Sequence, residues 1–174
     1  LGVLLLGIEA GIVLGVCCSI VAQLWRGSRP HVAVVGRVPD THYFRNTKRH
    51  LVEIEPHLLA LRIDENIFFA NTKAVEQAIS QALAEYPDTR EVLLILSAVN
   101  HIDSTGLDML SELTEGLKER DIGLHLAEVK GPVMDQLQHT DWIGRQIGRV
   151  FPSTDIAFNT LGKVASRAPA HSGE

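Results

Sequence analysis

The sequence predicts an α/β fold in which helices pack on a mixed β-sheet, preceded by one transmembrane α-helix. Residues 1–25 form an apolar run that only Glu9 interrupts with a charge, and about 20 apolar residues in a helix cross a bilayer core. In residues 31–174, short β-branched segments alternate with segments of helical period, a pattern typical of a sheet covered by helices. We therefore expect a membrane helix joined to one domain of about 140 residues.

The apolar run has the features of a membrane span. It ends at Trp25-Arg26-Gly27-Ser28-Arg29-Pro30, so its basic residues follow the run, whereas a signal peptide carries them in front. A buried core helix is the alternative, because Glu9 lowers the hydropathy. Arg26 and Arg29 place the C-terminal side in the cytoplasm by the positive-inside rule. The start on Leu1, without Met, predicts a piece of a longer protein.

A stripe of small residues follows one face of this helix. Gly7, Gly11, Gly15 and Ser19 are each four residues apart, which stacks them on one side. Such stripes let membrane helices approach closely, so we expect this face to pack against other membrane helices. The alternative is that glycine is simply common in membrane helices.

Composition argues against several classes of function. Sixteen basic and 21 acidic residues give a net charge of −5, whereas nucleic-acid binding favours basic patches. Cys17 and Cys18 are adjacent within the apolar run and the eight histidines are dispersed, so no metal site or cofactor is expected. The chain lacks a Gly-rich phosphate loop and the Gly-x-Ser-x-Gly elbow of a serine nucleophile. We therefore predict that it is not an enzyme.

Strands and helices alternate along the rest of the chain. The expected strands cover residues 31–38, 57–63, 67–70, 92–96, 124–129 and 150–151. The first expected helix covers residues 73–86, capped by Asn71 or Thr72. The second follows residues 100–106 and ends near Arg120, with Leu107, Leu110, Leu113 and Leu117 facing inward. Two more begin near 131 and 153. Asp64-Glu65-Asn66 is expected to turn a hairpin between the second and third strands, and residues 39–56 are expected to be irregular. The continuous apolar run at 92–96 indicates a central strand buried on both faces.

The most informative turn of the domain is Asp103-Ser104-Thr105-Gly106, where this central strand passes into a helix. Ligands of open α/β sheets bind beyond the carboxyl ends of the strands. A helix N-terminus there favours an anion or a phosphoryl group on Ser104 or Thr105. The alternative is capping alone, because Thr105 and Asp108 resemble a capping box.

The soluble part resembles a STAS domain, the fold of anti-sigma-factor antagonists. The resemblance rests on the strand at 92–96 followed by Ile102-Asp103-Ser104-Thr105-Gly106-Leu107. In regulatory members the serine after the aspartate is the phosphoacceptor, which implies that role for Ser104. The junction is similar to that of SulP anion permeases, through Ser28-Arg29-Pro30-His31-Val32-Ala33, Gly36-Arg37-Val38-Pro39, His42-Tyr43-Phe44-Arg45-Asn46, Arg62-Ile63-Asp64, Phe68-Phe69-Ala70-Asn71 and Phe151-Pro152-Ser153.

This resemblance implies the C-terminal part of a multi-span transporter of sulfate, bicarbonate or a related anion in the inner or plasma membrane. Residues 1–26 would end the membrane region, 27–38 would form the junction and first strand, 31–168 a cytoplasmic STAS domain, and 169–174 a polar tail. The domain would serve regulation, folding and dimerisation. A regulatory protein or nucleotide would bind near Phe69, Asn71 and residues 103–106, while the transported anion would bind upstream. The alternative is a membrane-tethered phospho-switch that binds a kinase.

Overall fold

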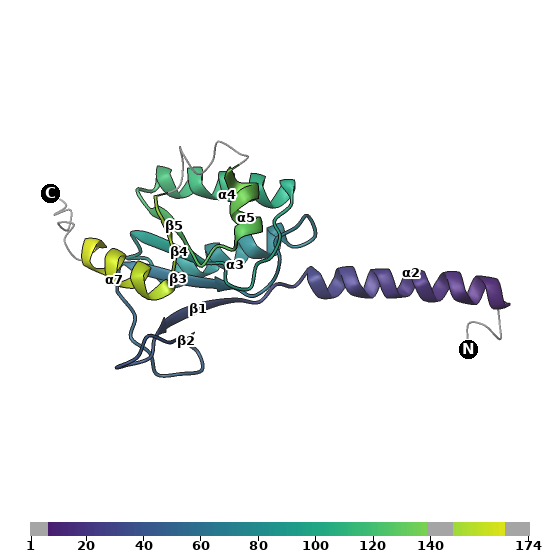
Figure 1. The fold of residues 1–174 in the computed structure, drawn as a ribbon, viewed down its shortest axis with the longest axis horizontal. Helices are drawn as coiled ribbons and strands as arrows, with labels where there is room; N and C mark the ends of the chain where they lie inside the picture. Colours follow the sequence, from purple (N-terminus) through teal and green to yellow (C-terminus); the bar gives the residue numbers. More distant parts are fainter. Residues whose placement is uncertain (1–6, 139–147, 166–174) are drawn as a thin grey trace.

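A computed structural model describes residues 7–138 and 148–165 of this chain. It shows an α/β domain from which one long helix leaves as a free rod (Figure 1). The predicted polar tail at 169–174 and the first six residues of the predicted membrane segment lie outside the described residues. The end of the predicted domain at residue 168 also lies outside them.

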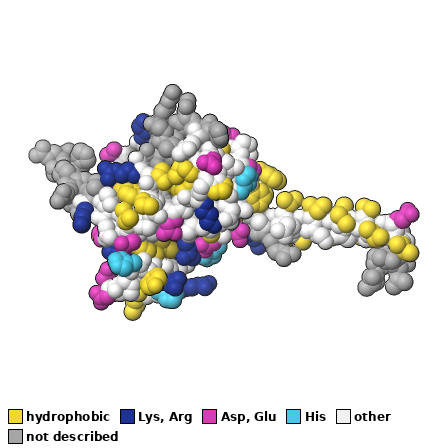
Figure 2. All heavy atoms as spheres, viewed as in Figure 1, with side chains coloured by type: hydrophobic (Ala, Val, Ile, Leu, Met, Phe, Trp, Pro, Cys, Tyr) yellow, Lys and Arg dark blue, Asp and Glu magenta, His cyan; other side chains and the backbone are white. Residues whose placement is uncertain are grey.

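The free rod is helix α2 (Ile8–Gly27). Its segment Ile8–Trp25 has a mean hydropathy of 1.8, is long and apolar enough to cross a membrane, and is not buried at all by the domain. Figure 2 shows hydrophobic side chains along the rod. The alternative of a buried core helix is therefore wrong for this structure. Gly7, the first residue of the small-residue stripe, precedes α2 and has a positive φ of 82°.

The domain is built on a six-stranded mixed sheet in the order β2-β1-β3-β4-β5-β6. The strands are β1 (Val32–Arg37), β2 (Phe44–Asn46), β3 (Leu58–Ile63), β4 (Glu91–Ile95), β5 (Gly123–Ala127) and β6 (Val150–Phe151). Strand β1 is antiparallel to β2 and β3, whereas β3, β4, β5 and β6 are parallel. The predicted mixed sheet is confirmed, and β2 lies within the segment that was expected to be irregular.

The hairpin expected around residues 64–66 is wrong. The antiparallel partner of β3 is β1, and residues 68–70 form no strand. Ile67 makes only an isolated parallel bridge to Ile102, and its side chain is fully buried. The segment is therefore apolar because Ile67 fills the core, and the residues after it form a turn rather than a strand.

Helices cover both faces of the sheet. They are α3 (Thr72–Glu85), α4 (Ser104–Glu119), α5 (Gly131–Gln138) and α7 (Thr154–Ala165). Helices α3, α4 and α5 share one core cluster with Val92 and Leu94 of β4, and α7 shares the second cluster with Leu93 and Ile95. Strand β4 is thus buried on both faces, as its apolar run predicts.

One edge of the sheet brings the end of α2 and the carboxyl ends of the parallel strands together. Because β1 is antiparallel to β3, Val32 at the start of β1 pairs with Ile63 at the end of β3. Strands β4 and β5 run parallel to β3, so their carboxyl ends lie at this same edge. The end of α2 therefore meets the edge at which the α/β rule places ligands.

The two-sided core predicts the cost of truncating β4. Leu94→Ala should lower the free energy of unfolding by about 2–5 kcal/mol, because the buried side chain leaves a cavity. Leu51→Ala is the matched control, since Leu51 is 95% exposed, and should change it by about 0.5 kcal/mol or less. Urea titration of the chain in detergent micelles, followed by circular dichroism, measures both; equal costs would contradict the described core.

Candidate functional site

The turn at residues 103–106 begins helix α4, and Asp103 is its N-cap. Asp103 Oδ1 accepts a hydrogen bond from Gly106 N at 2.8 Å, which satisfies a free amide of the first turn. The expected capping box of Thr105 and Asp108 is therefore wrong, because the cap lies two residues earlier. Ser104 and Thr105 occupy the first helical positions and are both exposed.

Gly106 is required by close packing beneath the turn. A Cβ atom on Gly106 would lie 2.8 Å from Ile102 Cγ2 and 3.0 Å from Ile67 Cγ2. Any side chain would therefore push these two buried residues apart. The glycine lets the start of α4 sit directly on the core.

Asp103 also ties this turn to the loop that follows β3. Its second oxygen, Oδ2, accepts a hydrogen bond from Phe69 N at 2.9 Å. One carboxylate thus joins the N-terminus of α4 to the segment 67–70. Ionised acceptors make the stronger hydrogen bonds, so the two segments are expected to move together.

Asn71 joins the same loop to the end of α2. Its side chain is completely buried, and Oδ1 accepts from Phe68 N at 3.0 Å. Nδ2 donates to Asn66 O at 2.7 Å and to Gly27 O at 3.1 Å. The amide is therefore engaged within the protein, and its expected side-chain cap on α3 is absent. In this conformation Asn71 offers no free group to a ligand.

Phe68 packs against the same end of α2. A Cβ atom on Gly27 would lie 2.9 Å from Phe68 Cζ, so the absence of a side chain at Gly27 allows this contact. We call Gly27, Phe68, Phe69, Asn71 and Asp103 the junction path. It connects the last residue of α2 to the first turn of α4 through hydrogen bonds and one aromatic contact.

Two further polar residues shape the turn: Asn66, which the sequence analysis expected only in a hairpin turn, and Gln136, which it did not name. Asn66 Oδ1 accepts from Asn100 N at 2.8 Å and from His101 N at 3.2 Å. Gln136 of α5 accepts from Ile102 N at 3.1 Å and lies 3.0 Å from His101 Nδ1. The only signal in the sequence was the turn chemistry of Asn66, since Gln136 is distant along the chain.

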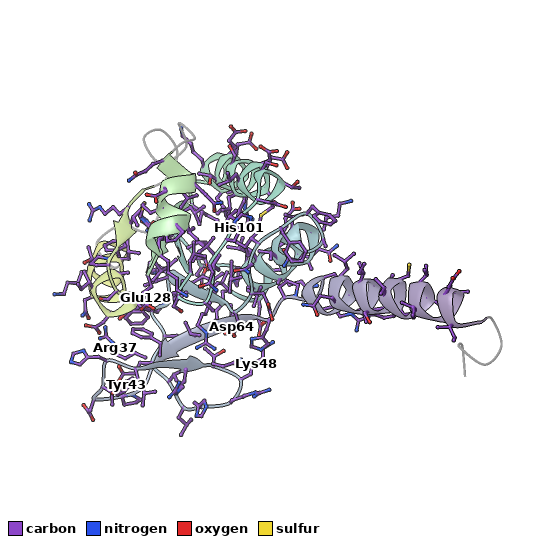
Figure 3. The ribbon with its side chains drawn as sticks, turned by 45° about the vertical axis from the view of Figure 1, so that its right-hand side comes forward. Arg37, Tyr43, Lys48, Asp64, His101 and Glu128 are labelled. Atoms are coloured by element: carbon purple, nitrogen blue, oxygen red, sulfur yellow. The ribbon has the colours of Figure 1, made fainter. Side chains whose placement is uncertain are left out.

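Several side chains around the turn are exposed to solvent. Phe69 is 64% exposed and meets Phe68 edge-on at 5.7 Å. Ser104 and Thr105 are exposed, and so is His101 (labelled in Figure 3), which contacts Gln136 of α5. Among the described residues, no three His, Cys, Asp or Glu side chains are grouped to hold a metal ion.

The charges at this edge of the sheet centre on Asp64. Arg62 Nε donates to Asp64 Oδ1 at 2.6 Å, and His31 Nδ1 lies 2.8 Å from Asp64 Oδ2. Partial burial raises the pKa of Asp64, but the hydrogen bonds from Arg62 and His31 outweigh it and hold the pKa below 3.8. The hydrogen bond to Asp64 in turn raises the pKa of Arg62.

Two glycines of the small-residue stripe, Gly7 and Gly15, face open space in the described chain. A Cβ atom on Gly7 or Gly15 would meet nothing within 4 Å. Ser19 Oγ donates to Gly15 O at 2.9 Å, so it satisfies its hydroxyl within the helix. The stripe is therefore open at Gly7 and Gly15.

The geometry of the turn predicts unequal costs for its two central residues. Asp103→Ala should destabilise the domain by about 1–3 kcal/mol, because Gly106 N and Phe69 N lose their acceptor. Ser104→Ala should cost about 0.5 kcal/mol or less, since Ser104 is exposed and does not cap the helix. Urea unfolding compares them, and a Ser104→Ala cost as large as that of Asp103→Ala would contradict this assignment.

The lowered pKa of Asp64 predicts a loss of stability in acid. Its ionised form stabilises the folded state above pH 3.8, and this contribution disappears as the pH falls through the lower folded-state pKa. The stability difference between the wild type and Asp64→Asn should therefore shrink from about pH 6 to about pH 3. Thermal unfolding across this range tests it, and a constant difference would exclude the effect.

Known proteins provide the comparison for this geometry. A model of the STAS domain family matches residues 50–157. High affinity sulfate transporter 2 of Stylosanthes hamata is 29% identical over 173 residues, and the match covers 92% of this chain and 26% of the transporter. The chain therefore spans about a quarter of the length of this relative.

Solved structures show the same fold at low sequence identity. The murine anion transporter Slc26a9 in its inward-facing state matches with a TM-score of 0.77 at 20% identity, over 88% of this chain and 25% of that one. The STAS domain of a SulP transporter from Vibrio cholerae matches with a TM-score of 0.55 at 19% identity, over 70% of this chain and 94% of that one. The predicted fold class and the resemblance to SulP transporters are confirmed, and the chain belongs to the STAS domain family.

Proposed function

We propose that this chain is the last membrane helix and cytoplasmic STAS domain of a SulP-type transporter of sulfate, bicarbonate or a related anion. Residues 27–174 make up 85% of the chain, whereas the match to the sulfate transporter of Stylosanthes hamata covers 92%. The similarity therefore extends into the apolar helix. The transported anion would bind in membrane helices upstream of residue 1, and the proposed roles in folding and dimerisation rest on the resemblance to SulP transporters.

The observation that carries a regulatory role is the junction path. A buried amide, Asn71, bonds to the end of α2, and Asp103 bonds the neighbouring loop to the start of α4. Packed and hydrogen-bonded elements with few alternative arrangements transmit displacement between sites. A change at residues 103–106 would therefore reach the end of α2, and the state of the membrane region would reach the turn.

Phosphorylation of Ser104 is the proposed signal that acts on the junction path. Its hydroxyl is exposed, and phosphorylation would add about −1.5 to −2 charges. The helix N-terminus would attract the phosphate, while the carboxylates of Asp103 and Asp108 would repel it. Because Asp103 holds both α4 and Phe69 N, this repulsion would act on the junction path itself.

The membrane side of the proposal concerns α2. Arg29 follows the helix and stacks over Trp25 with 5.3 Å between its Cζ atom and the ring centre, an arrangement suited to a membrane interface. We propose that Gly7, Gly11, Gly15 and Ser19 pack against other membrane helices, since small residues permit close approach. The domain would then lie in the cytoplasm.

Anion uptake by the full-length parent in proteoliposomes tests this function. Sulfate or bicarbonate uptake should respond to Ser104→Glu by about five-fold or more, the usual scale of a coupling between two sites. Ser80→Glu on α3 is the matched control, since Ser80 is also exposed. Gly27→Ala should weaken the response to Ser104→Glu by displacing Phe68, whereas Gly116→Ala, which meets nothing within 4 Å, should not.

The outcomes separate the alternatives. Uptake that Ser104→Glu leaves unchanged would support the transporter assignment and contradict a regulatory role of the turn. No uptake of any tested anion would favour the membrane-tethered phospho-switch, for which the exposed Ser104 and Phe69 would form the kinase-binding surface.

A further inference from the structure

A basic hollow lies beside the short connection between α2 and β1. It has a volume of about 380 Å³ and is lined by His31, Arg45, Asn46, Arg49, His50 and Arg62. Three arginines and two histidines thus face one space without a carboxylate among its lining residues. This is unusual in a chain whose net charge is −5.

Two of these arginines have no carboxylate partner among the described residues. Arg62 and His31 are held by Asp64, and Lys48 on the same loop lies 3.7 Å from Glu85. Within residues 7–138 and 148–165, the structure gives no ion pair to Arg45 or Arg49. Both guanidinium groups are therefore available to bind an anion from outside the domain.

Arg45 lies in β2, where it pairs with Gly36 of β1, and Arg49 lies in the loop that follows β2. Asn46 Oδ1 accepts from Lys48 N at 2.8 Å, and Asn46 O accepts from Arg49 N and His50 N. Thr47 N donates to Val34 O at 3.1 Å, which holds the loop against β1. Hydrogen bonds therefore hold the backbone at both arginines: the pairing of β2 with β1 at Arg45, and the turn after β2 at Arg49.

The hollow lies on the side of the domain from which α2 leaves. His31 follows the last residue of α2 by four positions and lines the hollow. Figure 3 places Lys48 and Asp64 on this side, while Arg37 and Tyr43 lie at the opposite end of the first two strands. In Figure 2 the lower edge of the domain shows basic and histidine side chains together with acidic and hydrophobic ones.

We propose that the basic hollow binds a phosphate-type oxyanion, supplied by the headgroup of an anionic lipid or as free phosphate. Arginine guanidinium groups fit phosphate oxygens in bidentate pairs. Basic residues next to a membrane helix are attracted to the anionic lipids of the cytoplasmic leaflet. The choice of a lipid rests on the proposed membrane position of α2, whereas the anion site rests only on the lining residues.

Amide NMR spectra of the 174-residue chain in phosphatidylcholine nanodiscs test the proposal. In one arm, phosphatidic acid replaces about a fifth of the lipid; in the other, inorganic phosphate is titrated at constant ionic strength. The wild type should show shift changes concentrated at residues 45–50 and 62. The double variant Arg45→Gln with Arg49→Gln should lower the apparent affinity for phosphatidic acid or phosphate about 10-fold or more, because each basic residue contributes to attraction by an anionic surface.

Lys118→Gln with Arg120→Gln is the matched control, because it removes the same charge from exposed residues of α4 and its C-terminal cap. It should leave the response unchanged. A response to phosphatidic acid alone assigns the site to a lipid, and a response to phosphate alone assigns it to a free anion. No response in either arm, or an equal loss in both double variants, would overturn the proposal without bearing on anion uptake.

Discussion

The pairing of β1 with β3 is the constraint on which the rest of the structure depends. Because the two strands are antiparallel, the chain that leaves α2 must enter the sheet at the edge where β3 ends. The parallel strands β4 and β5 end at this edge too, so the turn before α4 is brought to the end of α2. A parallel pairing would have placed α2 at the opposite edge, far from Asp103.

Asn71 makes this arrangement rigid rather than merely close. Burying an amide is costly unless its donors and acceptor are satisfied, and the fully buried Asn71 satisfies them with Phe68 N, Asn66 O and Gly27 O. Tilting the domain against α2 would break the bond to Gly27 and leave a buried donor unpaired, at about 1–3 kcal/mol. The junction therefore favours one orientation, and a signal must supply that energy to change it.

The sequence predicted the parts of this architecture that depend on local pattern. The run at 92–96 and the inward leucines of α4 required only the burial periods of a strand and a helix. The strand β2 has three residues and depends on its pairing with β1, so no local pattern marked it. The apolar residues Ile67, Phe68 and Phe69 predict a strand at 67–70, but the structure puts them in three different places. Ile67 is buried in the core, Phe68 packs against the end of α2, and Phe69 is exposed. The turn at 103–106 was found from its motif, whereas its links through Asn71 and Gln136 join residues more than 30 positions apart.

The two proposed inputs, a phosphate on Ser104 and an anion in the basic hollow, would act on the short connection between α2 and β1 from the same edge. From one side, the junction path holds Gly27 through Asn71; from the other, His31 is held by Asp64, both through its ring and through Asp64 N donating to His31 O at 3.0 Å. Residues 28–31 are thus fixed at both ends. An anion in the basic hollow would draw on Arg62 and His31, which now serve Asp64, while a charge on Ser104 would act through Asp103. Because both inputs converge on one four-residue connection, each would change the energy that the other needs to move α2, and this shared connection is the physical basis for coupling them.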